Sequence, residues 1–285
     1  MTVLKATAHA KLNLTLDVLG KRPDGYHNLR MVMQEIALGD EITLTLDTGE
    51  VWRVTSQSGD IPCDERNLAV KAAKLFFEAS NIPKPGLTVD IQKRTPVMAG
   101  MGGGSADGAA VLRLLQTHYG KPLPEKTLYQ LAEEIGSDVP FALFGGTALA
   151  EEKGQVLSRL PNLPDCEIVL CKPPFPVSTP ELFRAVDQET ITGRPDTERT
   201  LNALKQGSLS DVAAALGNVF APIIFRQHPE MADIQSTLLT YGALGAAMTG
   251  SGPTMFGLFS DVTTAKAAYL ALKPRYPDIF LTKPV

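Results

Sequence analysis

The chain has 285 residues, of which 44% are hydrophobic and 20% charged, a balance typical of a globular protein with a sizeable core. Its formal net charge of −4 gives no general electrostatic reason to bind nucleic acid or an anionic membrane, so we expect neither as a partner. No stretch approaches about 18 consecutive apolar residues, and the first residues do not form a secretory signal. We therefore expect a cytoplasmic protein.

The length favours two domains, because one domain usually has about 100–200 residues. The stretch 160–165 contains two prolines and marks the predicted boundary, which gives domains 1–160 and 161–285. Three cysteines without CxxC spacing predict ordinary reduced thiols, and we assign no metal ligands. We expect a monomer or a weak homodimer.

The chain begins with predicted strands. Between Ala8 and Val18, apolar and polar residues largely alternate, so Lys11 and Asn13 share the polar face of one strand. A turn-rich segment, 20–27, follows this strand, and the pattern then predicts two more strands at 41–46 and 51–55. The first part of the chain is therefore expected to form a β-rich layer.

Helices and strands are mixed in the rest of the chain. Helical spacing and cap residues predict helices at 67–79, 105–119, 125–135 and 139–144, and from about 209 and 231. Alternation predicts strands at 87–91 and 167–171, and glycines predict turns at 100–104 and 250–253.

The glycine-rich turn before the helix at 105–119 is the first feature with chemical content. Glycines remove the Cβ atoms that would keep a phosphate from the backbone N–H groups, and the following helix adds its N-terminal donors. The turn is not a Walker A loop, because no Gly-Lys-Ser/Thr follows, and Ser105 breaks the dinucleotide fingerprint. A flexible connection between a strand and a helix is the alternative interpretation.

The segment from Pro96 to Ala110 resembles the phosphate-binding motif of the GHMP kinases, and the segments 10–14 and 249–253 fall in the order that this family requires. The resemblance implies an α+β fold of two domains. The N-terminal one is a ribosomal-protein-like β-α-β domain, the C-terminal one is an α/β sandwich, and the active site lies in the cleft between them. It also implies an ATP-dependent kinase that acts on a small alcohol.

Within that superfamily, the segments 23–27 and 135–140 look like the kinases that phosphorylate 4-diphosphocytidyl-2-C-methyl-D-erythritol in non-mevalonate isoprenoid synthesis. This resemblance implies transfer of a phosphoryl group from ATP, with Mg²⁺, to the 2-hydroxyl of that acceptor. A GHMP kinase for another alcohol, such as homoserine or mevalonate, is one alternative. A non-enzymatic RNA-binding module is another, because the superfamily shares its β-α-β topology with ribosomal proteins.

The resemblance also implies roles for individual residues. Asp138 would act as base or orienting group at the acceptor hydroxyl, and Lys11 would stabilise charge at the reacting oxygens. Taken alone, a residue placed like Asp138 is more often a helix cap or part of an Asx turn, and one placed like Lys11 is usually a solvated strand residue. The predicted ATP-binding residues are Asn67, Lys93, Pro96, Gly100, Met101, Gly102, Gly103, Gly104, Ser105 and Asp107.

For the acceptor, a cytosine ring needs aromatic faces and hydrogen-bonding partners at its edge. Tyr26 and His27 offer both on one loop, and Phe183 would supply the second face, although a core aromatic would have the same spacing. The predicted acceptor-binding residues are Asn13, Tyr26, His27, Thr179, Phe183, Gly250 and Ser251.

Overall fold

The computed structural model describes residues 1–59, 61–189, 191 and 193–285. The chain forms two compact units. The first unit consists of Met1–Ala10, Leu38–Val97 and Gly102–Phe144, and the second unit consists of Lys11–Ala37, Met98–Met101 and Gly145–Val285. Strands β1 (Thr2–Lys21) and β2 (His27–Asp47) contribute residues to both units. The units are thus discontinuous in sequence, whereas the boundary near residue 160 stays a prediction.

The first unit has a sheet in which β4 (Gly86–Gln92) lies between β2 and β3 (Trp52–Ser56). Strand β4 is antiparallel to β2 and parallel to β3. In the second half of β2, Ile42, Leu44 and Leu46 are buried while the residues between them are half-buried. This alternation gives the sheet one face that packs on the core.

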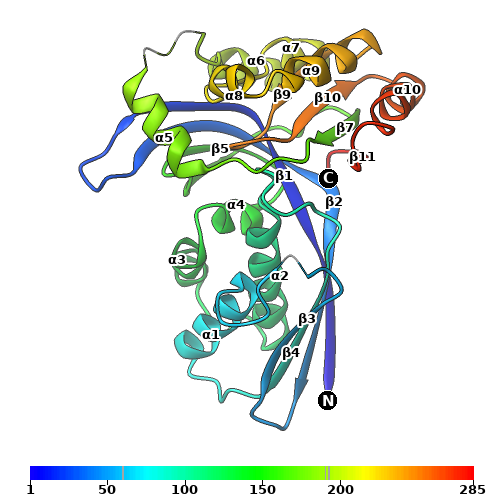
Figure 1. The fold of residues 1–285 in the computed structure, drawn as a ribbon. Helices are drawn as coiled ribbons and strands as arrows, with labels where there is room; N and C mark the ends of the chain where they lie inside the picture. Colours follow the sequence, from blue (N-terminus) through cyan, green and yellow to red (C-terminus); the bar gives the residue numbers. More distant parts are fainter. Residues whose placement is uncertain (60, 190, 192) are drawn as a thin grey trace. The chain divides into compact units, whose positions relative to one another are not determined.

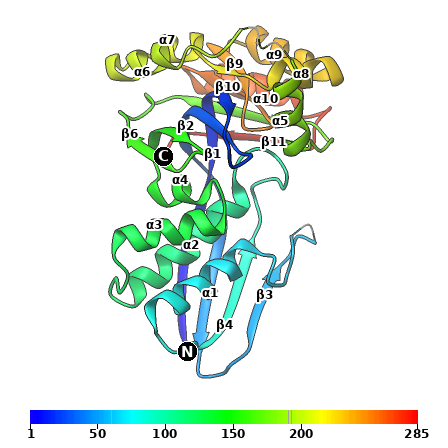
Figure 2. The same ribbon diagram turned by 90° about the vertical axis from the view of Figure 1, so that its left-hand side faces the viewer.

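Helices cover that face of the sheet (Figures 1 and 2). They are α1 (Leu68–Ser80), α2 (Gly103–His118), α3 (Glu125–Ile135) and α4 (Val139–Phe144). Phe76 and Phe77 of α1 are buried in the core of this unit. Helices α1 and α2 approach closely at Gly108, where an added Cβ would lie 3.1 Å from the carbonyl oxygen of Leu68.

The second unit contains a four-stranded antiparallel sheet of order β11-β7-β10-β9. The strands are β7 (Glu167–Lys172), β9 (Gly245–Met248), β10 (Met255–Phe259) and β11 (Asp278–Thr282). Helices α9 (Glu230–Thr240) and α10 (Val262–Leu272) pack on it (Figure 1). All five residues of β10 are buried, as expected for a strand whose two faces are both covered.

Other strands of the second unit belong to the sheet that contains β1 and β2, the two strands that also contribute residues to the first unit. The first half of β2 pairs with β5 (Thr147–Glu152), β5 pairs with β6 (Val156–Arg159), and β1 pairs in parallel with β8 (Gly217–Asn218). The remaining helices are α5 (Thr179–Gln188), α6 (Thr197–Gln206), α7 (Leu209–Ala214) and α8 (Ala221–Gln227).

Most elements predicted from the sequence are present, with shifted ends. The largest difference is β2, which begins at His27 rather than near residue 41. Four consecutive residues, 31–34, are buried there, so the strand is covered on both faces and its sequence shows no alternation. Helix α2 begins at Gly103, two residues earlier than predicted. The sequence did not indicate this first turn, because glycine has a low helix propensity.

Two further observations concern sequence-based expectations. None of the three cysteines forms a disulfide, and burial raises the pKa of both Cys166 and Cys171 to about 12, so these two thiols stay protonated. Among the described residues, no helix has the length and apolar character needed to span a membrane.

Candidate active site

Lys93 is held between two carboxylates in the first unit. Its Nζ atom lies 2.5 Å from Oδ2 of Asp40 and 3.1 Å from Oδ2 of Asp107, and all three side chains are almost completely buried. Asp40 is fixed from its other side, because its Oδ1 atom accepts hydrogen bonds from the backbone N–H groups of Arg94 and Thr95. The lysine is therefore a positioned cation whose charge is already compensated.

The environment of Asp107 raises the pKa of its carboxyl group. Burial raises the pKa of Asp107 to about 7; the Lys93 ammonium opposes this shift, and the nearby Asp40 carboxylate adds to it. In the described part of the chain, Oδ1 of Asp107 and Oγ1 of Thr95 are buried and have no hydrogen-bond partner. Buried polar atoms are rarely left unsatisfied, so these two oxygens indicate a place for a ligand or an ordered water.

The N-terminus of α2 lies directly beside this cluster. A Cβ atom added at Gly103 would lie 3.0 Å from Cγ2 of Thr95 and 3.3 Å from Nζ of Lys93, whereas one at Gly104 would meet only Cδ1 of Leu68, at 3.9 Å. The N–H groups of a first helical turn have no partner inside the helix. The loop therefore combines backbone donors with a lysine, an arrangement that suits an anionic group.

The other half of the glycine loop belongs to the second unit, where it contacts a second glycine turn. Gly100 has φ +72°, and a Cβ atom there would lie 2.6 Å from the carbonyl oxygen of Thr249. Gly250 has φ +59°, and a Cβ atom there would lie 2.5 Å from the carbonyl oxygen of Gly100. Only glycine permits both this backbone conformation and this close approach of the two turns.

Strand β1 completes this arrangement. The N–H group of Lys11 donates to the carbonyl oxygen of Met101 at 3.0 Å, and the N–H group of Asn13 donates to Oγ1 of Thr249 at 2.9 Å. Three segments that are far apart in the sequence, the N-terminal strand, the glycine loop and the C-terminal glycine turn, therefore meet in the second unit.

The side chains of Lys11 and Asn13 are buried, although the sequence alone suggested a polar strand face. Lys11 donates from Nζ to Oδ1 of Asn13 at 2.7 Å, and Nδ2 of Asn13 lies 3.3 Å from Sδ of Met31. A buried lysine must have partners, because an unpaired charge in the interior is costly. The solvated-strand interpretation of Lys11 is therefore wrong.

Asp138 immediately precedes α4 and is half-buried. Its carbonyl oxygen accepts a hydrogen bond from the N–H group of Ala142, which is the backbone bond expected at the start of a helix. Asp138 belongs to the first unit and Lys11 to the second. Their joint role stays a prediction based on their positions in the family motifs.

Asn67 has a local role that the sequence also allows. Its Oδ1 atom accepts a hydrogen bond from the N–H group of Ala69 and caps α1, and its Nδ2 atom donates to the carbonyl oxygen of Pro62. Two hydrogen bonds thus hold the side-chain amide inside the protein. The role of Asn67 in ATP binding stays a prediction.

Four of the residues predicted to bind the acceptor, His27, Thr179, Phe183 and Ser251, lie on α5 or contact it in the second unit. The ring of His27 stacks on the ring of Phe183, with centroids 4.6 Å apart and planes inclined by 20°. Oγ1 of Thr179 donates to Oγ of Ser251 at 2.8 Å, and Ser251 follows Gly250 in the C-terminal turn. Tyr26 is exposed, with the ammonium of Lys153 5.2 Å from the centroid of its ring.

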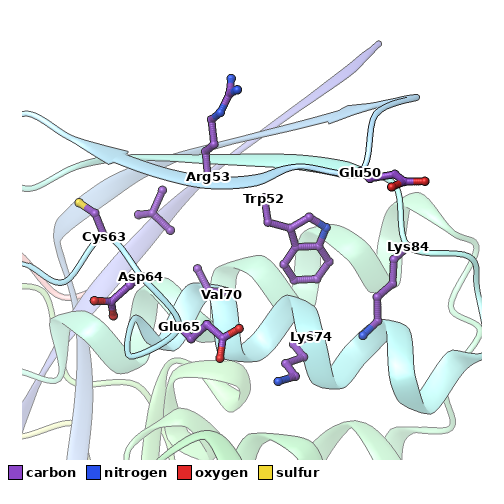
Figure 3. A pocket seen from close by; sticks show the side chains of 10 residues that line it. Glu50, Trp52, Arg53, Cys63, Asp64, Glu65, Val70, Lys74 and Lys84 are labelled. Carbon is purple, nitrogen blue, oxygen red and sulfur yellow. The ribbon is translucent and has the colours of Figure 1, made fainter.

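A separate pocket of about 410 Å³ lies between β3 and α1 in the first unit (Figure 3). Trp52 and Val70 contribute apolar surface, and charged side chains such as Lys74 and Lys84 lie around them. Among the described residues that line this pocket, none is a predicted site residue. The pocket is therefore a feature of the β3–α1 groove rather than of the glycine loop.

Sequence reasoning missed three residues that organise the site. Asp40 fixes Lys93, Asp187 contacts His27, and Asn218 donates from Nδ2 to the carbonyl oxygens of Met248 and Gly250. None of the three lies in a recognisable motif. Their contacts join positions distant in sequence, so only the tertiary structure reveals them.

Comparison with known proteins gives consistent matches along the chain. The family model described as GHMP kinases N terminal domain matches residues 67–146, and the model described as GHMP kinases C terminal matches residues 200–278. The chain is 42% identical over 281 residues to 4-diphosphocytidyl-2-C-methyl-D-erythritol kinase of Pelotomaculum thermopropionicum, covering 99% of this chain and 98% of that protein. It is 41% identical over 279 residues to the kinase of the same name from Clostridium kluyveri, covering 98% and 99%.

Solved structures agree with the sequence matches. A crystal structure of 4-(cytidine 5′-diphospho)-2C-methyl-D-erythritol kinase superimposes with a TM-score of 0.83 and 33% identity, covering 99% of each chain. Homoserine kinase from Cytophaga hutchinsonii superimposes with a TM-score of 0.78 and 19% identity, covering 99% of this chain and 95% of that one. The second likeness shows a shared fold alone.

Proposed function

The chain belongs to the GHMP kinases and, within them, to the family of the 4-diphosphocytidyl-2-C-methyl-D-erythritol kinases, and we propose that it phosphorylates 4-diphosphocytidyl-2-C-methyl-D-erythritol with ATP. The two-domain α+β fold that the sequence predicts is confirmed by these comparisons. In the reaction, the acceptor hydroxyl, which we take to be the 2-hydroxyl, bonds to the γ-phosphorus of ATP. The bond from the γ-phosphorus to the bridging oxygen breaks, ADP leaves, and the hydroxyl proton passes to a base.

One observation carries the proposal beyond sequence similarity. The three family motifs meet through backbone contacts in the second unit, where Lys11 bonds to Met101 and Gly100 packs on Gly250. Phosphoryl transfer needs positioned groups and compensated charge more than covalent chemistry, so such a rigid frame of backbone and lysine suits it.

Lys11 and Asp138 are the proposed catalytic residues. Asp138 would accept the proton of the acceptor hydroxyl or orient it, and Lys11 would stabilise negative charge on the oxygens that react. Burial strengthens the effect of the Lys11 charge, because water no longer screens it. Asn13, bonded to Lys11, would orient that ammonium and contact the polyol.

The first turn of α2 fits the phosphates of the donor, because Gly103 and Gly104 carry no side chain there and Ser105 adds a hydroxyl. Lys93 and Asp107, beside Gly103, would contact the rest of the nucleotide, and the unsatisfied oxygen of Asp107 is available for it. Bound Mg²⁺ would neutralise the β- and γ-phosphates, and we assign it no protein ligand.

The acceptor would be recognised by aromatic residues of the second unit. Phe183 and Tyr26 offer faces for a cytosine ring, and base–aromatic stacking is worth about 1–3 kcal/mol. Thr179, Gly250 and Ser251 lie together through the bond between the two hydroxyls and would contact the diphosphate or the polyol. Homoserine and mevalonate have no base, and would leave these aromatic residues unused.

The test is an ADP-release assay with Mg²⁺ and ATP. We expect turnover with 4-diphosphocytidyl-2-C-methyl-D-erythritol, and ³¹P NMR should show a new phosphomonoester on the acceptor. Homoserine and mevalonate at equal concentration serve as comparison acceptors. Equal turnover of either would falsify the acceptor assignment, and no turnover of any acceptor would contradict the kinase assignment.

A further inference from the structure

The turn that carries Asp138 lies between two helices of the first unit. Helix α3 ends at Ile135, Gly136 follows in an extended conformation, and α4 begins directly after Asp138. The N–H group of Gly136 donates to the carbonyl oxygen of Ala132, and that of Val139 donates to the carbonyl oxygen of Gly136. The end of α3 therefore places the backbone from which the Asp138 side chain projects.

The end of α3 carries an excess of negative charge. The last carbonyl groups of a helix have no partner inside the helix, and they form the negative end of its dipole. In α3 this end also holds two exposed acidic residues, Glu133 and Glu134. A cation beside these carbonyl groups stabilises the helix end, because it compensates the negative charge and donates to the free acceptors.

Lys71 of α1 supplies such a cation. Helices α1 and α3 pack against each other (Figure 2). The Nζ atom of Lys71 donates a hydrogen bond to the carbonyl oxygen of Glu134 and lies 3.4 Å from the carbonyl oxygen of Ile135. Lys71 is half-buried, so water screens its charge only in part. A side chain of the neighbouring helix thus caps α3 at the residues that precede the turn with Asp138.

This turn also lies beside the proposed donor site. A Cβ atom added at Gly136 would lie 3.8 Å from Cδ1 of Leu68, the first residue of α1, and 4.0 Å from Oγ of Ser105. Ser105 is in the first turn of α2, which is proposed to bind the phosphates of the donor. The contact between Lys71 and α3 therefore fixes the Asp138 turn close to the helix that holds the group to be transferred.

We propose that Lys71 is a positioning residue of the phosphoryl transfer, which fixes the turn between α3 and α4 so that the Asp138 carboxylate points at the acceptor hydroxyl. The inference rests on the proposed function, because it concerns the role of Asp138 in that reaction. Lys71 acts through the end of α3 and touches neither substrate. Its loss lets the carboxylate leave the geometry that proton transfer needs.

Steady-state kinetics of Lys71→Met are the first test. We expect kcat to fall by about tenfold, because a small displacement of a catalytic group is costly, and the KM values of ATP and the acceptor to stay nearly unchanged. Lys71→Arg should retain most of the activity, since a guanidinium also donates to carbonyl oxygens at a helix end. Equal losses in the two variants, or an unchanged kcat in Lys71→Met, would overturn the proposal.

Lys74→Met is the matched control, because Lys74 lies on the same helix, carries the same charge and is exposed beside the pocket between β3 and α1. Its kcat should equal that of the unaltered protein. The Asp138→Asn protein separates positioning from a general effect on folding. In that protein, Lys71→Met should change kcat by less than about twofold, because the carboxylate that Lys71 positions is already absent. The same tenfold loss with and without Asp138 would refute the positioning role.

Amide hydrogen exchange followed by mass spectrometry is a second measurement, independent of activity. In Lys71→Met, peptides that cover residues 136–142 should exchange faster than in the unaltered protein, because the end of α3 has lost its cap. Lys74→Met should leave this exchange unchanged. Identical exchange of these peptides in all three proteins would contradict the inference. Failure of the proposed function is visible separately, as no turnover of the acceptor by the unaltered protein.

Discussion

At the scale of single residues, charge and burial distinguish the groups that the proposed reaction uses. Lys11 and Lys93 are both buried lysines, but their surroundings differ. Lys93 lies between the carboxyl groups of Asp40 and Asp107 in the first unit. Lys11 donates to the side-chain amide of Asn13 in the second unit. Lys11 stays the proposed catalytic lysine because of its position in the N-terminal family motif, and Lys93 stays a proposed group of the donor site.

Asp138→Asn tests the proposed base. We expect kcat to fall by about 10²-fold or more while ATP binding stays nearly unchanged, since positioned acid–base groups typically contribute 10²–10⁴-fold. Steady-state kinetics and nucleotide titration measure the two effects. Asparagine caps helices about as well as aspartate, so a variant with normal kcat would show that Asp138 is only the cap of α4.

Asp107→Asn tests the buried carboxyl by its effect on stability at different pH values. The unfolded chain loses the Asp107 proton near pH 3.8, whereas the folded chain keeps it until about pH 7. Between these values the folded state binds more protons, so the contribution of Asp107 to the free energy of unfolding falls as the pH rises. Denaturant titrations from pH 4 to 8 should show this fall in the unaltered protein and a weaker one in the variant. Parallel curves for the two proteins would exclude the raised pKa.

At the scale of elements, the frame of the second unit depends on two glycine turns that touch through their backbones. Gly100 and Gly250 both have positive φ angles and each would place a Cβ atom against the backbone of the opposite turn. Asn218, in β8, adds two hydrogen bonds to the segment around Gly250. The position of Lys11 and Met101 thus depends on residues almost 240 positions apart.

Gly250→Ala tests this contact, with Gly207→Ala as its control. Gly207 has a similar φ of +67°, but an added Cβ there would have nothing within 4 Å, so alanine suffers only backbone strain, about 1–2 kcal/mol. Alanine at Gly250 also overlaps the carbonyl of Gly100, so it should lower the free energy of unfolding further and reduce kcat/KM by about 10²-fold. Equal losses of stability and activity in the two variants would show that the turn contact has no special role.

At the scale of the whole molecule, the charge balance opposes the binding of two polyphosphates. The net charge is −4, both proposed substrates are anionic, and Lys93 is already paired with carboxylates. Binding must therefore depend on local donors and on counter-ions brought by the nucleotide. The residues proposed for the donor belong mostly to the first unit and those proposed for the acceptor to the second.

Removal of Mg²⁺ tests this account. Chelation with EDTA should abolish ADP release, and an excess of Mg²⁺ should restore it, because the developing charge on the β- and γ-phosphates then has its counter-ion again. The melting temperature of the nucleotide-free protein, measured with and without EDTA, is the control and should not change. Full turnover in EDTA would contradict the role given to the metal.

The sequence by itself determined the features that depend on local chemistry. The glycines at 100–104, the order of the three motifs and the periodic helices in the first unit can all be read from neighbouring residues, because turns, helix caps and amphipathic faces are local properties. The fold and the proposed reaction followed from the resemblance that these motifs carry.

Only the tertiary structure decided which groups meet. The burial of Lys11, the pairing of Lys93 with Asp40 and the contact of His27 with Asp187 join residues that no spacing connects. The sequence also failed to predict the first half of β2, since a strand that is covered on both faces has no alternating pattern. Burial and pairing depend on what packs against a residue, and this is a property of the folded chain rather than of its local sequence.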